Sequence, residues 1–270
     1  MSKADPAAPQ LAVSEAQSPT LSRVIRSEWI KFRTLRSSKW LIACAMLVMI
    51  AIGILIEYNT RHLAANIQLN DADQSGPLQG YYMATYLLGA LGVVFVTGEY
   101  ATGMVSSTFA AVPKRVPVFV AKTIIIFAVS WIGMTISTVV TFLGSQALIS
   151  HFRTGFSLSD SVSLRVVFGT GLYLALLSVL ASALGWIIRK TAGAIVTFFA
   201  VAIALPLLLS LFGKIGESIA AYSPILAGSS FIQAHPEPHT LSGWVGLIVL
   251  LAWILVGLSG ALWRLISTDA

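Results

Sequence analysis

Six apolar runs separated by short polar connections constrain the fold of this chain more than any other feature. They cover residues 40–56, 81–97, 123–148, 166–188, 192–212 and 244–266. Even the shortest is close to the length that a helix needs to cross a hydrocarbon layer about 30 Å thick. Inside such a layer a helix satisfies its backbone N–H and C=O groups internally. The runs therefore predict an all-α integral membrane protein with six transmembrane helices.

The composition agrees with a membrane protein. Hydrophobic residues make up 56% of the chain and charged residues 10%, with a mean hydropathy of +0.83, whereas about a quarter of a soluble domain is charged. Residues 1–19 are rich in Ala, Pro and Ser and lack the apolar core of a signal peptide, which predicts a disordered cytoplasmic tail. Residues 20–270 are then a single six-span domain. Cys44 is the one cysteine and lies within an apolar run, so no internal disulfide is expected.

The basic residues indicate an orientation in the membrane. They gather at the ends of the apolar runs, so the formal net charge of +6 does not indicate nucleic-acid binding. One set of alternate connections carries Lys3, Arg23, Arg26, Lys31, Arg33, Arg36, Lys39, Lys114, Arg115, Lys122, Arg189, Lys190 and Arg264. The other set carries Arg61, Arg153, Arg165 and Lys214. Because cytoplasmic connections are enriched in Lys and Arg, both termini are predicted to be cytoplasmic.

Residues 21–35 are predicted to form an amphipathic interface helix before the first span. Its apolar side is made by Leu21, Val24, Ile25, Trp29, Phe32 and Leu35. Glu28 lies in the middle of that side, where an unpaired carboxylate is costly. Lys31, three residues further on, is the nearest partner on the same helix. We favour a local surface pair for Glu28; the alternative is an anchoring contact to a partner subunit or to the base of the bundle.

The connection at residues 98–122 is too polar to cross a bilayer. Its apolar residues recur at helical spacing, which is not typical of a flexible linker. Residues 102–112 predict a short helix, with one face made by Met104, Val105, Phe109 and Val112. Pro113 ends this helix, and Pro117 fits the first turn of the next one. A short helix joined closely to two spans can transmit a movement that a flexible loop could not.

Small and polar residues form stripes on three spans, as at helix contacts in lipid. The third span carries Ser130, Ser137, Thr141, Gly144 and Ser145, and the fourth Gly171, Ala175, Ser178, Ser182 and Gly185. The fifth carries Gly193, Thr197, Ala200 and Ala204, followed by Pro206, which is expected to kink it. We favour tight packing within the subunit. The alternative is that Ser130, Ser137, Thr141 and Ser145 line a substrate path.

Several kinds of chemistry are not indicated. No Asp, Glu, Lys, Arg or His lies well inside a run, which disfavours proton or sodium coupling, and no phosphate-binding loop of the form GxxxxGK[ST] is present. The outer segment 213–243, with short helices expected at 215–221 and 224–234, contains His235 and His239. The prolines between these histidines forbid a zinc-binding helix, so a turn-rich loop is favoured over a metal site. No catalytic, cofactor or metal site is expected.

Three features together resemble the membrane subunit of a type-two ABC transporter, the exporter permease family, and in style its actinobacterial members. They are Arg26-x-Glu28-x-x-Lys31 before the first span, six spans with both ends inside, and Gly98-Glu99-Tyr100-x-Thr102-Gly103 continuing to Val112-Pro113-x-Arg115 and Lys122. The resemblance covers nearly the whole chain after the tail. It implies a coupling helix between spans two and three that docks on a separate ATPase subunit.

The resemblance also assigns residues to this region. The coupling positions are Glu99, Gly103, Met104, Phe109, Pro113, Arg115 and Lys122, and the interface-helix positions are Arg26, Glu28 and Lys31. Similar sequences often have a basic residue where this chain has Ser106. A charged contact between the coupling helix and the ATPase is therefore not implied here.

The resemblance implies a permease in the bacterial cytoplasmic membrane. Two permease copies, as a homodimer or heterodimer, would work with two ATPase subunits that bind ATP and Mg. The apolar, hydroxyl-bearing spans suit export of an amphipathic or hydrophobic substrate such as a drug, peptide or lipid. Membrane lipid is an expected partner, and nucleic acid is not. The alternatives are a secondary transporter without an ATPase and a non-transporting membrane scaffold or sensor.

Overall fold

The computed structural model describes residues 20–64, 75–111, 115–149, 157–234 and 240–267, and every regular element in these ranges is a helix. The predicted tail at 1–19, the coupling position Pro113 and the pair His235 and His239 lie outside the described residues.

Helices α1 (Leu21–Thr34) and α2 (Arg36–Ala64) open the described chain. The next elements are η2 (Gly76–Leu78), α3 (Tyr81–Ala101), α4 (Met104–Ala111), α5 (Arg115–Ile149) and α6 (Ser161–Ile188). They are followed by α7 (Thr191–Phe199), η3 (Ala200–Ala204), α8 (Leu205–Ser210), α9 (Gly213–Ala220), α10 (Pro224–Ile232) and α11 (Gly243–Ser267).

Six helical stretches are long and apolar enough to cross a membrane. They are Arg36–Thr60, Gly76–Ala101, Arg115–Leu148, Ser161–Ile188, Thr191–Ser210 and Gly243–Ser267. The prediction of an all-α chain with six membrane-spanning helices is confirmed in the described residues.

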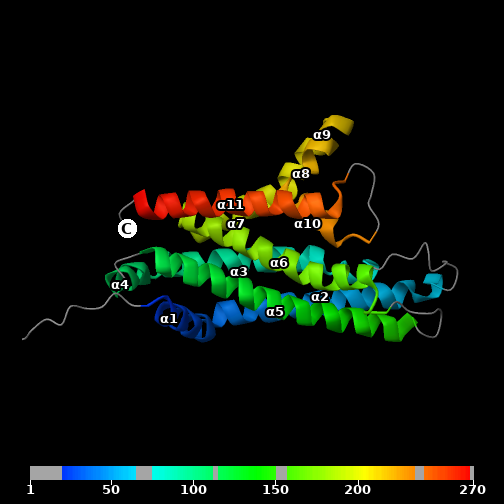
Figure 1. The fold of residues 1–270 in the computed structure, drawn as a ribbon, viewed down its shortest axis with the longest axis horizontal. Coiled ribbons are helices and arrows are strands. Elements are labelled where there is room, and N and C mark those ends of the chain that lie inside the picture. Colours follow the sequence, from blue (N-terminus) through cyan, green and yellow to red (C-terminus); the bar gives the residue numbers. More distant parts are fainter. Residues whose placement is uncertain (1–19, 65–74, 112–114, 150–156, 235–239, 268–270) are drawn as a thin grey trace, which may run out of the picture.

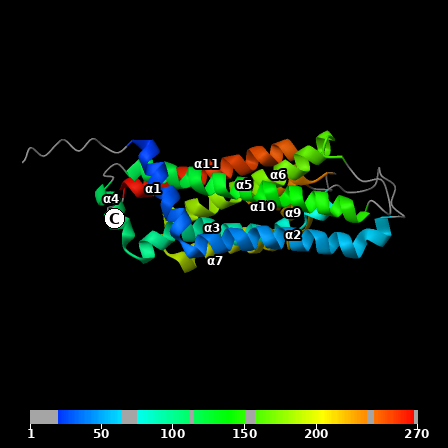
Figure 2. The ribbon, with the colours of Figure 1, turned by 90° about the horizontal axis from the view of Figure 1, so that it is seen from below.

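The long helices lie side by side along the longest axis of the molecule (Figures 1 and 2). Helices α1 and α4 lie at one end, called here the α4 end, and α9 and α10 lie toward the other, called here the α10 end (Figure 1). Helix α6 is central: it packs against α3, α5, α10 and α11, and most of its side chains are buried. Helices α2, α7 and α11 expose apolar side chains, as expected of faces that meet lipid.

Small residues set the closest helix contacts. A Cβ placed on Gly92 of α3 would overlap the backbone oxygen of Ser178 in α6, and one on Gly171 of α6 would overlap Thr135 of α5. Gly53 of α2 meets Thr141 of α5 in the same way. The stripes on the third and fourth spans therefore belong to contacts within the chain.

The fifth span is not one regular α-helix. Helix α7 changes to a π-helical turn at Ala200–Ala204, and α8 begins at Leu205, directly before Pro206. Proline removes a backbone donor and disturbs the turn before it, and π-turns are a common cause of helix distortion. The interruption was expected from Pro206, but the π-helical turn was not.

Candidate coupling site

Four charged side chains, Glu28, Lys31, Glu99 and Lys122, meet at the α4 end and are called here the ion cluster. Glu28 and Lys31 come from α1, Glu99 from the end of α3, and Lys122 from α5. Glu28 and Lys122 are each 1% exposed and Glu99 is 5% exposed. The two carboxylates balance the two ammonium groups, which is the condition under which buried charges are tolerated.

The two lysines each contact both carboxylates. Lys31 Nζ donates to Glu28 Oε1 at 2.6 Å and to Glu99 Oε1 at 2.8 Å. Lys122 Nζ donates to Glu99 Oε1 at 2.9 Å. Its distance to Glu28 Oε2 is 2.6 Å, an ion pair that lacks the angles of a hydrogen bond. The cluster therefore joins α1, α3 and α5 through a closed ring of ion pairs.

Two further contacts extend the ion cluster. Lys31 Nζ donates to the Thr108 hydroxyl of α4 at 3.1 Å. Lys122 Nζ lies 4.5 Å from the centroid of the Phe95 ring, whose edge packs on Phe32 of α1. An ammonium group over an aromatic face is stabilised by the ring quadrupole, more so when it is out of water. The charged groups thus also fix α4 and the adjoining apolar core.

The surroundings of Lys31 keep it charged. Burial alone would lower the pKa of its ammonium group, but the hydrogen bonds and negative charges of Glu28 and Glu99 outweigh burial and hold the pKa above 10.5. A group whose pKa is raised by folding stabilises the folded state below its unfolded pKa and ceases to do so as pH rises through its folded pKa.

We therefore expect the stabilisation from Lys31 to be constant near neutral pH. The difference in Tm between the wild type and Lys31→Met should not change up to about pH 9 and should shrink only under more alkaline conditions. Thermal unfolding in detergent at several pH values measures this difference. A difference that already shrinks between about pH 7 and 9 would contradict the assignment.

The favoured interpretation of Glu28 as a surface pair is wrong. Its pair with Lys31 is present, but the carboxylate is buried and also contacts Lys122, 94 positions further along the chain. The contact anchors α1 to the base of the bundle, which was the alternative. A carboxylate at the centre of an apolar face was the signal available from the sequence.

Helix α4 is short and presents two different sides. Gly103, with φ of 72°, makes the turn from α3 in a conformation that favours glycine. Val105 is 7% exposed, and the half-buried Phe109 packs near Val24, Val118 and Ala121. Met104 is 46% exposed. The four apolar residues predicted to share one face therefore do not, because Met104 lies on the open side; Val112 is outside the described residues.

Arg115 and Arg26 are the predicted positions that remain. Arg115 lies at the start of α5, where its guanidinium donates to the Leu265 carbonyl of α11 at 3.1 Å and lies 5.3 Å from the Phe109 ring centroid. Arg26 is exposed on α1. The structure thus brings Glu28, Lys31, Glu99 and Lys122 together and leaves Arg26 outside this group.

The hydroxyl stripe of α5 lies in the protein interior. Its residues Ser130, Ser137, Thr141 and Ser145 are all buried. The last three donate to backbone carbonyls of their own helix, at 3.0, 2.8 and 2.7 Å. This arrangement favours the packing interpretation over a substrate path, because a helix that satisfies its own hydroxyls can pack closely without an external donor.

The fold and the ion cluster define a class: a multi-pass membrane protein in which a short helix between two spans is fixed to the bundle by buried charges. The sequence model of the family described as "ABC-2 family transporter protein" matches residues 24–206. The chain therefore belongs to the ABC-2 transporter family, as a membrane permease component of an ABC transporter. A comparison with curated proteins gives no match.

The matched range contains the ion cluster and α4, and it ends at Pro206 in α8. Membership implies, in general terms, an ABC ATPase partner and a dimeric assembly. It also agrees with a place in the bacterial plasma membrane.

Proposed function

We propose that this chain is the permease subunit of an ATP-driven exporter, in which α4 receives the movement of a separate ABC ATPase. The observation that carries this proposal is the contact of Lys31 with Glu28, Glu99 and Thr108. These contacts join α1, α3 and α4 at one point, and Lys122 adds α5. A force applied to α4 would therefore reach two spans through charged contacts that cannot be separated cheaply.

The open side of α4 is the proposed docking surface. It is made by Met104, Ser106, Ser107 and Ala110, all of which are exposed. These side chains are small or apolar and carry no charge. Docking on the ATPase would therefore depend on shape and apolar burial, with Met104 as the one long side chain that can fill a cleft.

The proposed working unit contains two permease copies, as a homodimer or heterodimer, and two ATPase subunits that carry ATP and Mg. The positive end of the chain, which holds α1 and α4, would face the cytoplasm because of its Lys and Arg excess. The substrate would be amphipathic or hydrophobic, such as a drug, peptide or lipid, and would leave from the cytoplasm or the inner leaflet. Exposed apolar side chains on α2, α7 and α11 supply surface for a second copy as well as for lipid.

The docking surface gives a direct test. The tagged chain, purified from its native membranes, should bring with it a protein that contains a Walker-type phosphate loop and hydrolyses ATP. Changing Met104 and Ala110 together to Asp should reduce that recovery about tenfold or more, because two carboxylates would be placed in an apolar contact. Recovery of the ATPase is measured by mass spectrometry and by ATP hydrolysis in the purified sample.

The matched control is Ser22→Asp, at an exposed position on α1 instead of on the open side of α4. It adds a carboxylate at the same end of the bundle and should leave the recovery unchanged. A chain that is fully active in transport alone, without ATP and without this partner, would contradict the proposal and favour a secondary transporter.

A further inference from the structure

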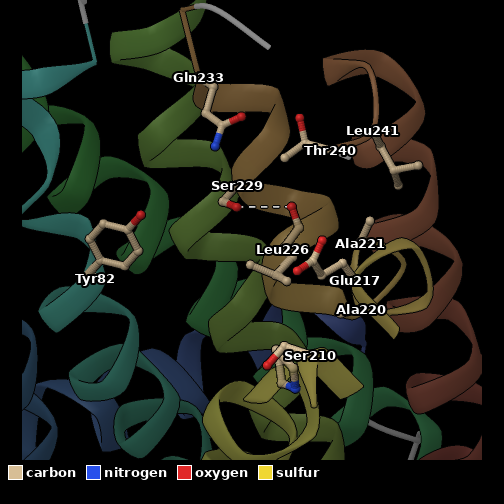
Figure 3. A pocket seen from close by; sticks show the side chains of 11 residues that line it. Tyr82, Ser210, Glu217, Ala220, Ala221, Leu226, Ser229, Gln233, Thr240 and Leu241 are labelled. Carbon is tan, nitrogen blue, oxygen red and sulfur yellow. Dashed lines mark hydrogen bonds between the residues drawn. The ribbon is translucent and has the colours of Figure 1, made fainter. Parts of the chain in front are cut away.

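A cavity of about 260 Å³ lies at the α10 end between α3, α8, α9 and α10. Its polar side chains are Tyr82, Ser210, Glu217, Ser229, Gln233 and Thr240, and Figure 3 shows them around the space beside α10. We call it the α9 cavity, after the helix that carries Glu217. Of the residues that line it, only Tyr82 and Pro206 fall within the range matched by the family. Membership of the family therefore does not account for its chemistry.

The α9 cavity carries a carboxylate that has no counter-ion among the described residues. Glu217 is exposed at its edge and forms no ion pair with any described residue. No Lys, Arg or His is among the described residues that line the cavity. Lys214 is one turn away on the same helix but does not line it. A cation from outside the chain is the complement of this arrangement.

Three of the other polar groups of the α9 cavity, on Ser210, Ser229 and Gln233, are available as hydrogen-bond acceptors. Ser229 uses its one proton on the Leu226 carbonyl at 3.0 Å, and Ser210 uses its proton on the Leu207 carbonyl at 2.7 Å. Their oxygens keep free lone pairs. The side-chain oxygen of Gln233 is buried and has no hydrogen-bond partner among the described residues. The groups of the cavity that can donate are the Gln233 amide nitrogen and the hydroxyls of Tyr82 and Thr240.

The backbone that carries Gln233 is held in place. Arg165 of α6 donates to the backbone oxygens of Phe231 at 2.6 Å and Gln233 at 3.0 Å, which secures the end of α10. Figure 3 shows the side chains of Gln233, Ser229 and Glu217 in this order from top to bottom. A buried acceptor without a donor is unfavourable, and a ligand that brings a donor relieves this cost.

We infer that the α9 cavity binds the protonated amine of an organic cation. A primary ammonium group supplies one positive charge for Glu217 and three N–H donors for the oxygens of Gln233 and the serines. The volume is slightly below the range of about 300–1,000 Å³ usual for drug-sized ligands, so the cavity takes an amine-bearing head group and leaves the rest of the molecule outside. The identification of this amine as part of the exported substrate rests on the proposed function. The binding of the amine to the cavity does not.

Three probes of similar size test the charge preference: phenethylamine, 2-phenylethanol and phenylacetate. Binding is measured by titration calorimetry to the purified permease in phosphatidylcholine nanodiscs, without ATPase, and empty discs give the background. The wild type should bind phenethylamine at least about tenfold more tightly than the neutral or anionic probe. Equal binding of the three probes overturns the inference.

Two variants test whether phenethylamine binds in the α9 cavity. Glu217→Gln keeps the size of an exposed side chain and should weaken phenethylamine binding about tenfold or more, whereas Gln233→Glu should strengthen it by adding a second carboxylate. Lys214→Gln is the matched control on the same helix and should not weaken binding. Unchanged affinity in Glu217→Gln overturns the inference, and monodisperse elution of the variant shows that it is folded.

The outcomes also separate this inference from the proposed function. If the chain recovers its ATPase but shows no preference for the amine, the α9 cavity is not an ammonium site. If it binds the amine selectively but recovers no ATPase, the exporter assignment fails and the binding site stands.

Discussion

Replacing Lys122 by methionine is expected to lower the free energy of unfolding by about 3–5 kcal/mol, the usual cost of removing one partner from a buried ion pair. Methionine replaces most of the apolar stem of the side chain but leaves Glu28 and Glu99 buried with Lys31 as their only cation in the ion cluster. The contact with the Phe95 ring would also lose its charge. Denaturant-induced unfolding of the purified permease, followed by tryptophan fluorescence, measures the change.

The matched control is Lys190→Met, because Lys190 is an exposed lysine between α6 and α7. It should change stability by less than about 0.5 kcal/mol, as is usual for surface substitutions. Adding Glu28→Gln to Lys122→Met should recover part of the lost stability, since it removes one uncompensated charge. Equal stability of Lys122→Met and Lys190→Met would mean that the cluster does not hold the α4 end together.

Gly92→Ala is expected to destabilise the bundle although it adds only one methyl group. That methyl would overlap the Ser178 backbone oxygen and approach the Ser182 nitrogen, so α3 and α6 would have to separate. Forcing extra volume into a packed interior costs about 1–3 kcal/mol, and a backbone atom cannot turn aside as a side chain can. The shift in Tm measured by fluorescence-detected size exclusion reports the loss.

The control for Gly92→Ala is Gly98→Ala in the same helix, where a Cβ would meet nothing within 4 Å. Alanine is favoured over glycine in a helix interior by about 0.5–1 kcal/mol, so this variant should be neutral or slightly more stable. If both variants behave alike, α3 and α6 do not pack as closely as the structure has them.

The helices could be predicted from the sequence because apolar length is a local property. The second span was predicted to begin at residue 81 and the fourth to end at residue 188, where α3 and α6 do so. Helix α5 begins at Arg115 with Pro117 in its first turn, as expected, and therefore extends beyond the apolar run at 123–148. Lys122 lies within this helix, where the carboxylates of Glu28 and Glu99 neutralise its charge.

The ion cluster could be predicted only in part. Helical spacing identifies Glu28 with Lys31, because residues three apart share a face. It does not identify Glu99 or Lys122 as partners, since those contacts depend on how α1 packs across α3 and α5. Resemblance to a family assigned Glu99 and Lys122 to the coupling region and Glu28 and Lys31 to the interface helix, without indicating that the two groups touch. Phe109 shows the same limit: its spacing matched a docking face, yet it packs toward the bundle while Met104 stays open.

The π-helical turn before Pro206 has a consequence for the α9 cavity. Beyond this turn, α8 buries none of its residues and α9 buries only Gly216 and Ala220, whereas most of α10 is buried. The wall of the cavity made by α8 and α9 is therefore held less firmly than the wall made by α10. Moving α8 and α9 outward would separate few buried side chains, while moving α10 would break the contacts of Arg165. We therefore expect the cavity to widen for a ligand by movement of α8 and α9 away from α10.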